Sequence, residues 1–255
     1  MNFGASNSYY CSRMKYQSIF IVALLSVFSI SSCTELSTLV DETGLTNEEV
    51  VAGLKSALTV GTDTSVQILS VVDGYLEDEL VKILLPDEAL PILTNLAKVP
   101  GGQLLIDNAI KAINRSAEDA AIEAKPIFID AITGMTIEDG FAILKGGNSA
   151  ATEYLNKNTN TALNAAFKPK ISTSLNKKLV GNTSAESAYS SLITAYNTAS
   201  LNGLLFAKIT TNSLTDHTTE KALNGLFLKV EGEELKIRTD AEHRVNDILK
   251  KVFGE

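Results

Sequence analysis

Apolar side chains recur every three or four residues along most of this chain, and this spacing decides its fold class. The longest such run extends from Leu105 to Met135 and contains Pro126. Side chains at this spacing share one face of an α-helix, and Pro126 lacks a backbone donor, so the run predicts one helix with a kink. No alternating apolar and polar run flanked by hairpin dipeptides competes with this pattern. The sequence therefore predicts an all-α fold.

Capping residues and prolines divide the rest of the chain into further helices. Thr136 and Asp139 have the spacing of a capping box, which marks a helix start. Asn148 or Ser149 opens the next helix, which is expected to break near Pro169. Together these signals predict a single domain of roughly eight to ten helices. The later segments expected to be helical are 185–196, 214–234 and 240–253.

The stretch ahead of these helices has the order of a secretory leader. Met14 is followed by Lys15, by an apolar run from Ile19 to Ile30, and then by small residues and Cys33. This order is typical of a signal peptide, and the run is shorter than the roughly 20 apolar residues of a transmembrane helix. The tetrad Ile30-Ser31-Ser32-Cys33 resembles the lipobox of bacterial lipoproteins. That resemblance implies a mature protein that begins at Cys33 and carries acyl chains on it.

The leader sets the expected domain organisation and localisation. Residues 1–32 form the leader, in which 1–13 are interpreted as a wrongly assigned start ahead of Met14; residues 33–46 form a lipidated tether, and residues 47–255 the helical domain. The acyl chains would anchor the domain to a membrane without spanning it. In the bacterial lipoproteins that this leader resembles, an Asp directly after the lipidated cysteine is an inner-membrane retention signal. Thr34 follows Cys33 here, so the resemblance implies anchoring to the outer membrane, and we expect the domain on its periplasmic face. The alternative is an uncleaved helix followed by a buried cysteine.

Composition excludes several classes of function. Hydrophobic residues make up 45% of the chain and charged residues 20%, as in a globular domain. The formal net charge of −8 and the lack of a basic, aromatic-containing window argue against nucleic-acid binding. Cleavage of the leader would remove Cys11, and a lipidated Cys33 would leave no free thiol for catalysis.

No familiar catalytic or metal-binding pattern is present. His217 and His243 are the two histidines, and neither has a Glu three residues ahead, as a di-iron bundle site requires. There is no G-x-S-x-G nucleophile motif, and Gly146-Gly147 follows Lys145 instead of preceding a Lys-Ser or Lys-Thr pair. We therefore predict no catalytic residue, no metal and no cofactor.

The densest polar cluster lies on an alanine-rich helix and has two interpretations. The first is a solvated face with weak ion pairs of about 0.3–0.5 kcal/mol each. The second is a partly buried network that converges with a neighbouring helix and forms a ligand-binding or catalytic site. On this helix the cluster comprises Asn114, Arg115, Glu118, Asp119 and Glu123, and in the second interpretation a neighbouring helix contributes Lys145 or Thr152 to the candidate site.

The functional prediction follows from the anchor and the missing catalytic set. We expect a non-enzymatic module that binds a protein or peptide of the cell envelope, with an enzyme or small-ligand binder at the polar cluster as the alternative. The charged segment from Glu231 to Asp240 is interpreted as a solvated helix end. Alternatively, it docks a partner through Arg238, whose guanidinium can hold a carboxylate by two hydrogen bonds.

Several stretches of the chain resemble a family of bacterial lipoproteins known as domain of unknown function number four-one-nine-seven. The resemblance spans nearly all of the chain from Glu49 to Gly254. It implies one mostly helical domain behind a lipoprotein leader, and it implies no reaction. The stretches are VVDGYLEDELVKILLP, INRSAEDAAIEAKPIFIDAITGMTIEDGFAILKGG, ATEYLNKNTNTAL, KALNGLFLKVEGEELKIRTD and DILKKVFG.

Overall fold

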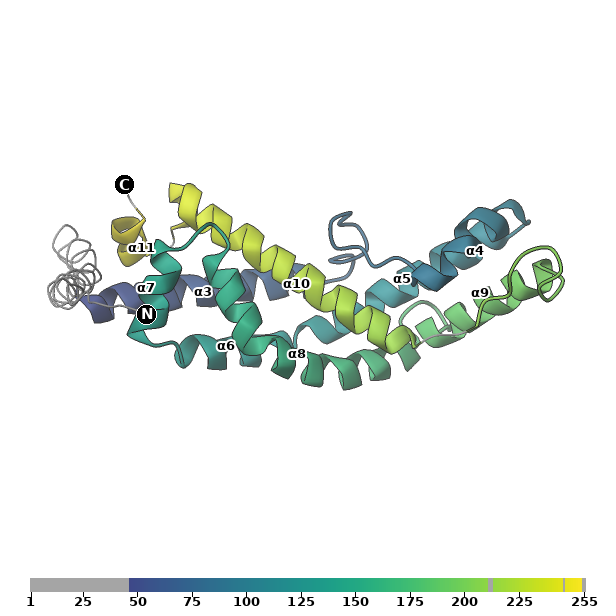
Figure 1. Cartoon of the computed structure of the whole chain (residues 1–255), viewed down its shortest axis with the longest axis horizontal. Coiled ribbons are helices and arrows are strands. Elements are labelled where there is room, and N and C mark those ends of the chain that lie inside the picture. The colour runs from purple at the N-terminus through teal and green to yellow at the C-terminus, as the bar shows by residue number, and fades with distance from the viewer. Residues whose placement is uncertain (1–45, 211–212, 245, 254–255) are drawn as a thin grey trace, which may run out of the picture. The chain divides into compact units, whose positions relative to one another are not determined.

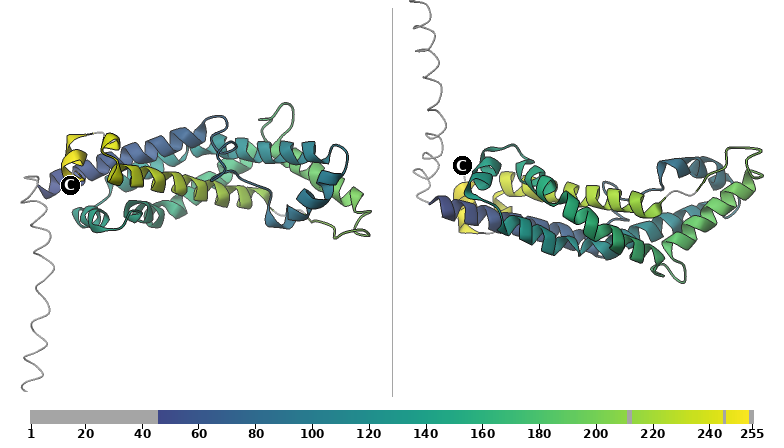
Figure 2. Two further views of the ribbon diagram at one scale, coloured as in Figure 1. Left: turned by 90° about the horizontal axis from the view of Figure 1, so that it is seen from above. Right: turned by 60° about the horizontal axis from the view of Figure 1, so that its bottom comes forward.

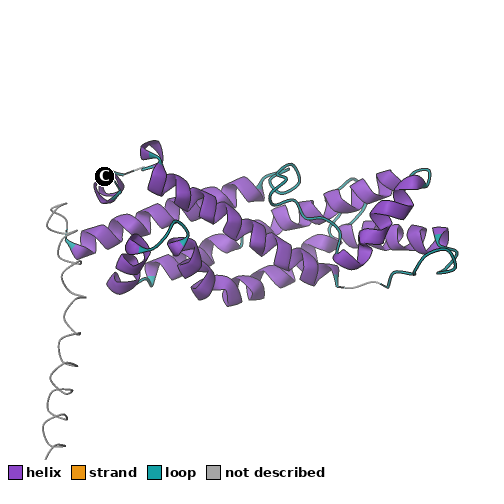
Figure 3. Cartoon of the chain, turned by 45° about the horizontal axis from the view of Figure 1, so that its top comes forward, coloured by secondary structure: helices purple, strands orange, loops and turns teal. Residues whose placement is uncertain are grey.

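The described part of the chain is an all-α domain. A computed structural model describes residues 46–210, 213–244 and 246–253, and these residues contain nine α-helices and no β-strand (Figures 1 and 3). The chain divides into two units, Met1–Asn47 and Glu48–Glu255, and the helices belong to the second. The leader and the lipobox predicted from the sequence lie outside the described residues. The helices are α3 (Asn47–Ser70), α4 (Leu90–Asn95), α5 (Gly102–Ala121), α6 (Ala124–Thr133), α7 (Ile137–Lys145), α8 (Ala150–Asn176), α9 (Ala185–Ala199), α10 (Leu214–Thr239) and α11 (Asp247–Val252).

Long helices packed side by side form the core of the domain. Helix α8 packs along α10, α5 and α6, and α5 packs along α9 (Figures 1 and 2). The rings of Phe128 and Phe227 meet edge to face, with centroids 5.9 Å apart. Buried alanines such as Ala112 and Ala117 on α5 let neighbouring helices approach closely. The all-α fold predicted from the apolar periodicity is therefore confirmed.

The helix boundaries agree with the predicted caps at some positions and differ at two prolines. Thr136 and Asp139 form the predicted capping box of α7. The run from Leu105 to Met135 is two helices, because the chain breaks between α5 and α6 just before Pro126; the prediction of one kinked helix is wrong. Conversely, α8 continues through Pro169, where a break was predicted. Phe167 and Ile171 beside it are fully buried, so packing outweighs the lost backbone hydrogen bond.

The C-terminal segment differs from its predicted single helix. Helix α10 extends to Thr239, and a short 3-10 helix (Ala241–His243) then separates it from α11. Ala57 of α3, Ile237 of α10 and Leu249 of α11 form a small separate apolar cluster. Helix α11 thus packs where the first and last long helices of the domain meet.

Candidate functional site

The turn after α3 is sharp, and its residues explain the local path. Asp73 has a positive φ of 73°, a conformation that aspartate tolerates better than most residues. At Gly74 a Cβ atom would lie 2.3 Å from the carbonyl oxygen of Ile68, so only glycine fits this close approach. The next side chain, Tyr75, is fully buried, and its hydroxyl donates to the carbonyl of Ala222 at 2.8 Å. Burial raises the pKa of the Tyr75 hydroxyl and keeps it a neutral donor.

Glu118 and Arg115 of α5 fasten this turn. The Glu118 carboxylate is 4% exposed and accepts hydrogen bonds from the backbone N–H groups of Tyr75 and Leu76, at 3.2 and 3.3 Å. Arg115 donates to Glu118 at 2.6 Å and to the carboxylate of Asp73 at 2.7 Å. Each charge of this buried network has a partner within the chain, so the network stabilises the path of the segment after α3.

Asn114 fastens the same segment at a second point. Its side chain is fully buried; the carboxamide oxygen accepts from the N–H of Ile83 and the amide donates to the carbonyl of Ile83, both at 2.8 Å. These two hydrogen bonds resemble those between paired β-strands. They satisfy the backbone N–H and C=O groups of Ile83, which lies in an extended segment with no strand beside it. The carboxamide of Asn114 is therefore engaged in hydrogen bonds that hold the fold.

Asp119 of α5 and Glu123, which lies in the turn between α5 and α6, instead form surface contacts with the C-terminal end of α8. Asp119 accepts from the hydroxyl of Ser174 at 2.5 Å and pairs with Lys177, and Glu123 pairs with Lys170 at 2.8 Å. Partial burial disfavours the Asp119 carboxylate, but hydrogen bonds from Lys177 and Ser174 outweigh it, so the pKa of Asp119 lies below its ordinary value. The Asp119 side chain is 33% exposed. The weak-ion-pair interpretation describes these two residues.

Lys145 and Thr152 do not join the cluster. Thr152 lies in the first turn of α8 and Ser174, the partner of Asp119, in its last turns. They are 22 residues apart, which is about 33 Å along a helix. Lys145 ends α7, just ahead of α8. The structure thus keeps Thr152 apart from Asp119, because the length of α8 separates them, and the alternative in which the two converge does not describe this arrangement.

Thr152 belongs to a second buried ionic network, which sequence reasoning missed. Glu234 of α10 is 6% exposed and accepts from the backbone N–H groups of Ala151 and Thr152 at 2.9 and 2.8 Å, and from the Thr152 hydroxyl at 2.9 Å. Arg238 pairs with Glu234 at 2.8 Å and donates to the carbonyl of Ile143 at 2.9 Å. Glu234 thus caps the N-terminus of α8 from another helix.

This second network corrects the interpretation of the charged segment in α10. A solvated helix end was expected there, but Glu234 and Arg238 are largely buried, with side chains 5% and 11% exposed. Arg238 also lies over the ring of Phe253, 5.7 Å from its centroid. The sequence carries no signal for this network, because Ser149 has the residue type of an N-cap. In the structure its hydroxyl instead bonds Glu153 and leaves the first amides of α8 to Glu234.

Two negative findings apply to residues 46–210, 213–244 and 246–253. They contain no group of three His, Cys, Asp or Glu side chains placed to hold a metal ion. None of their helices is both long and apolar enough to cross a membrane.

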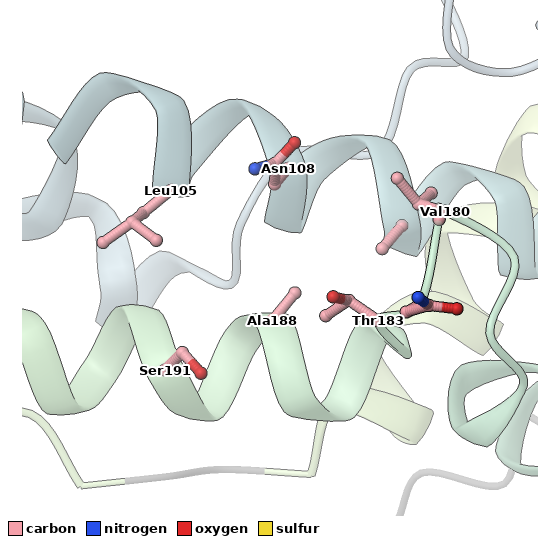
Figure 4. Close-up of a pocket in the computed structure, with 9 residues that line it drawn as sticks. Leu105, Asn108, Val180, Thr183, Ala188 and Ser191 are labelled. Atoms are coloured by element: carbon pink, nitrogen blue, oxygen red, sulfur yellow. The ribbon is translucent and has the colours of Figure 1, made fainter. Parts of the chain in front are cut away.

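An uncharged pocket lies between α5 and α9. Its volume is about 400 Å³, within the range of ligand sites. Figure 4 shows Leu105 and Asn108 of α5 opposite α9, with the turn from Val180 to Thr183 at one end. The side-chain amides of Asn108 and Asn182 form no hydrogen bond within the described part of the chain. The full lining is Leu105, Asn108, Ala112, Val180, Gly181, Asn182, Thr183, Ala188 and Ser191.

Fold and site define the class of this protein as an all-α domain whose buried charges fasten a turn and a helix end. The model of the family of proteins of unknown function DUF4197 matches residues 44–254, so the chain belongs to this family and the resemblance seen in the sequence is confirmed. No curated protein and no solved structure matches the chain.

Proposed function

We propose that this protein is a lipid-anchored, non-enzymatic binding module of the bacterial cell envelope, held at the periplasmic face of the outer membrane. The non-enzymatic part of the proposal rests on one observation: the charged side chains of the cluster are bound to other groups of the chain itself. Arg115 and Glu118 are bound to each other and to the chain's own turn, and Asp119 is paired with Lys177. A catalytic carboxylate needs a free approach to a substrate. These groups are committed to internal contacts instead.

The anchor is supported by the sequence. The order of Lys15, the apolar run and the tetrad that ends at Cys33 matches a lipoprotein leader. Two or three acyl chains hold a protein durably at a bilayer, whereas one chain gives only marginal binding. From Cys33 to Thr46 the tether can reach on the order of 40 Å.

We expect Cys33→Ala to abolish lipidation of the full chain. The variant lacks the thiol that would carry the diacylglycerol, so incorporation of labelled palmitate is expected to vanish and the precursor to keep its leader. Cys11→Ala is the matched control and should be labelled like the parent. Unchanged labelling of Cys33→Ala would contradict the lipoprotein proposal.

The uncharged pocket is the surface at which we expect a partner. Its free amides and hydroxyls, from Asn108, Asn182 and Ser191, suit the peptide groups of a protein or peptide. A photocrosslinking residue at Asn182 is therefore expected to capture a specific envelope protein in living cells. The same residue at Asn160, exposed on α8, is the control. Identical capture at both positions, or capture at neither, would count against the pocket as the binding surface.

A further inference from the structure

The end of α9 carries a leucine where a glycine is usual. The N–H of Asn202 donates to the carbonyl of Asn197 at 2.8 Å, and the N–H of Leu201 donates to that of Thr198 at 3.0 Å. These two bonds define a Schellman motif, in which the residue after the cap takes a left-handed conformation that favours glycine. Leu201 occupies this position with a φ of 51°. The backbone there is strained, because a Cβ atom disfavours that conformation.

The loop that follows is held firmly in place. The side-chain amide of Asn197 donates to the carbonyl of Ile209, and its oxygen accepts from the N–H of Ile209, both at 3.0 Å. The ring centroids of Phe206 and Tyr196 are 4.8 Å apart, and Ser200 is fully buried. A strained residue persists where its surroundings fix it, and such residues gather at functional sites.

The fixed loop turns its leucines outward. Leu201, Leu204 and Leu205 are 58%, 78% and 65% exposed, so the chain's own packing does not account for the strain at Leu201. Three partly exposed leucines are far less surface than the roughly 800 Å² per partner of a standard protein interface. A small, protruding group of leucines can instead be buried on all sides by the hydrocarbon of a lipid bilayer.

Charge distinguishes this loop from the loop that carries Leu80, another highly exposed leucine. Residues 199–210 contain Lys208 and no acidic residue, in a chain of net charge −8. Leu80, 76% exposed, instead directly follows Glu77, Asp78 and Glu79. Anionic lipid surfaces attract lysine and repel carboxylates. The loop after α9 therefore combines exposed apolar surface with a positive charge, whereas the loop at Leu80 does not.

We propose that Leu201, Leu204 and Leu205 insert into the surface of the lipid bilayer to which the protein is anchored. The proposal rests on the proposed anchor at Cys33, since a tethered domain meets the bilayer at high effective concentration and a small group of leucines then suffices. Figure 1 shows the end of α9 at the opposite end of the bundle from the first turn of α3. Insertion therefore gives the domain a second point of attachment.

Tryptophan fluorescence tests this insertion, because the chain has no native tryptophan. The lipidated full chain with Leu204→Trp is reconstituted on vesicles of phosphatidylethanolamine and phosphatidylglycerol, some with brominated acyl chains. Its emission is expected to shift to shorter wavelength and to be quenched by bromine. Leu80→Trp is the matched control, at an equally exposed leucine, and is expected to be quenched several-fold less.

A second variant separates insertion from stability. Leu201→Gly is expected to relieve the strain and to raise the Tm by about 2–4 °C. In the Leu204→Trp background it should reduce quenching, because one inserted leucine is lost. A structural role for Leu201 predicts the reverse, a lower Tm, and that result overturns the proposal.

The remaining outcomes are equally decisive. Vesicle flotation with equal quenching of the two reporters overturns the insertion and leaves the anchor intact. Failure of the full chain to float overturns the anchor, and the insertion with it. A Leu204→Trp emission that responds to envelope proteins and not to vesicles assigns the loop to a protein partner and also overturns the proposal.

Discussion

Glu118→Ala is expected to lower the free energy of unfolding by about 3–5 kcal/mol, the usual cost of breaking a buried ion pair from one side. The substitution leaves the N–H groups of Tyr75 and Leu76 without their acceptor and removes one of the two carboxylates that pair with Arg115. Urea unfolding followed by circular dichroism measures the loss.

Glu123→Ala is the control for this prediction, because Glu123 lies just after α5, in the turn before α6, and pairs with Lys170 at the surface. Exposed pairs contribute about 0–1 kcal/mol, so this variant should unfold almost like the parent. If the two variants cost the same, Glu118 is not the fastening point that the contacts indicate.

Glu234→Ala is expected to cost a similar amount, about 3–5 kcal/mol. The carboxylate caps α8 through the N–H groups of Ala151 and Thr152, and it neutralises the largely buried Arg238. Without it, the first turn of α8 loses its acceptor and Arg238 loses its counter-charge. The Tm and the midpoint of urea unfolding both measure this change.

Glu231→Ala provides the matched comparison on the same helix. Glu231 is exposed, and substitutions at such surface positions usually change stability by no more than about 0.5 kcal/mol. An equal loss for Glu231→Ala would indicate a general effect of negative charge on α10. A large loss confined to Glu234→Ala supports the capping role.

Most of the helices could be predicted because their signals are local. The three-and-four spacing of apolar residues and the Thr136–Asp139 box act within a few residues, and the structure keeps both. Pro169 could not be judged locally. Its helix survives because Phe167 and Ile171 pack into a core formed by distant segments. The helix-breaking tendency of a proline is a local property, and it takes no account of the stabilisation that such packing provides.

The roles of the polar residues depend on partners far away in sequence. Glu118 binds Tyr75 across 43 positions, and Glu234 binds Ala151 across 83. The sequence shows that Arg115, Glu118 and Asp119 are clustered, but the turn at Asp73 decides which of them is buried. This is why the cluster divides into a buried network and a surface ion pair, which the helical spacing alone does not distinguish.

Amide hydrogen exchange in Glu118→Ala tests most directly whether the buried cluster serves to fasten the segment after α3. The contacts predict that the amides of Tyr75 and Leu76 lose protection well before amides in the middle of α8, such as that of Leu163, because their acceptor is gone. If Tyr75 and Leu76 stay as protected as in the parent protein, or lose protection only in step with Leu163, the fastening role of Glu118 is contradicted.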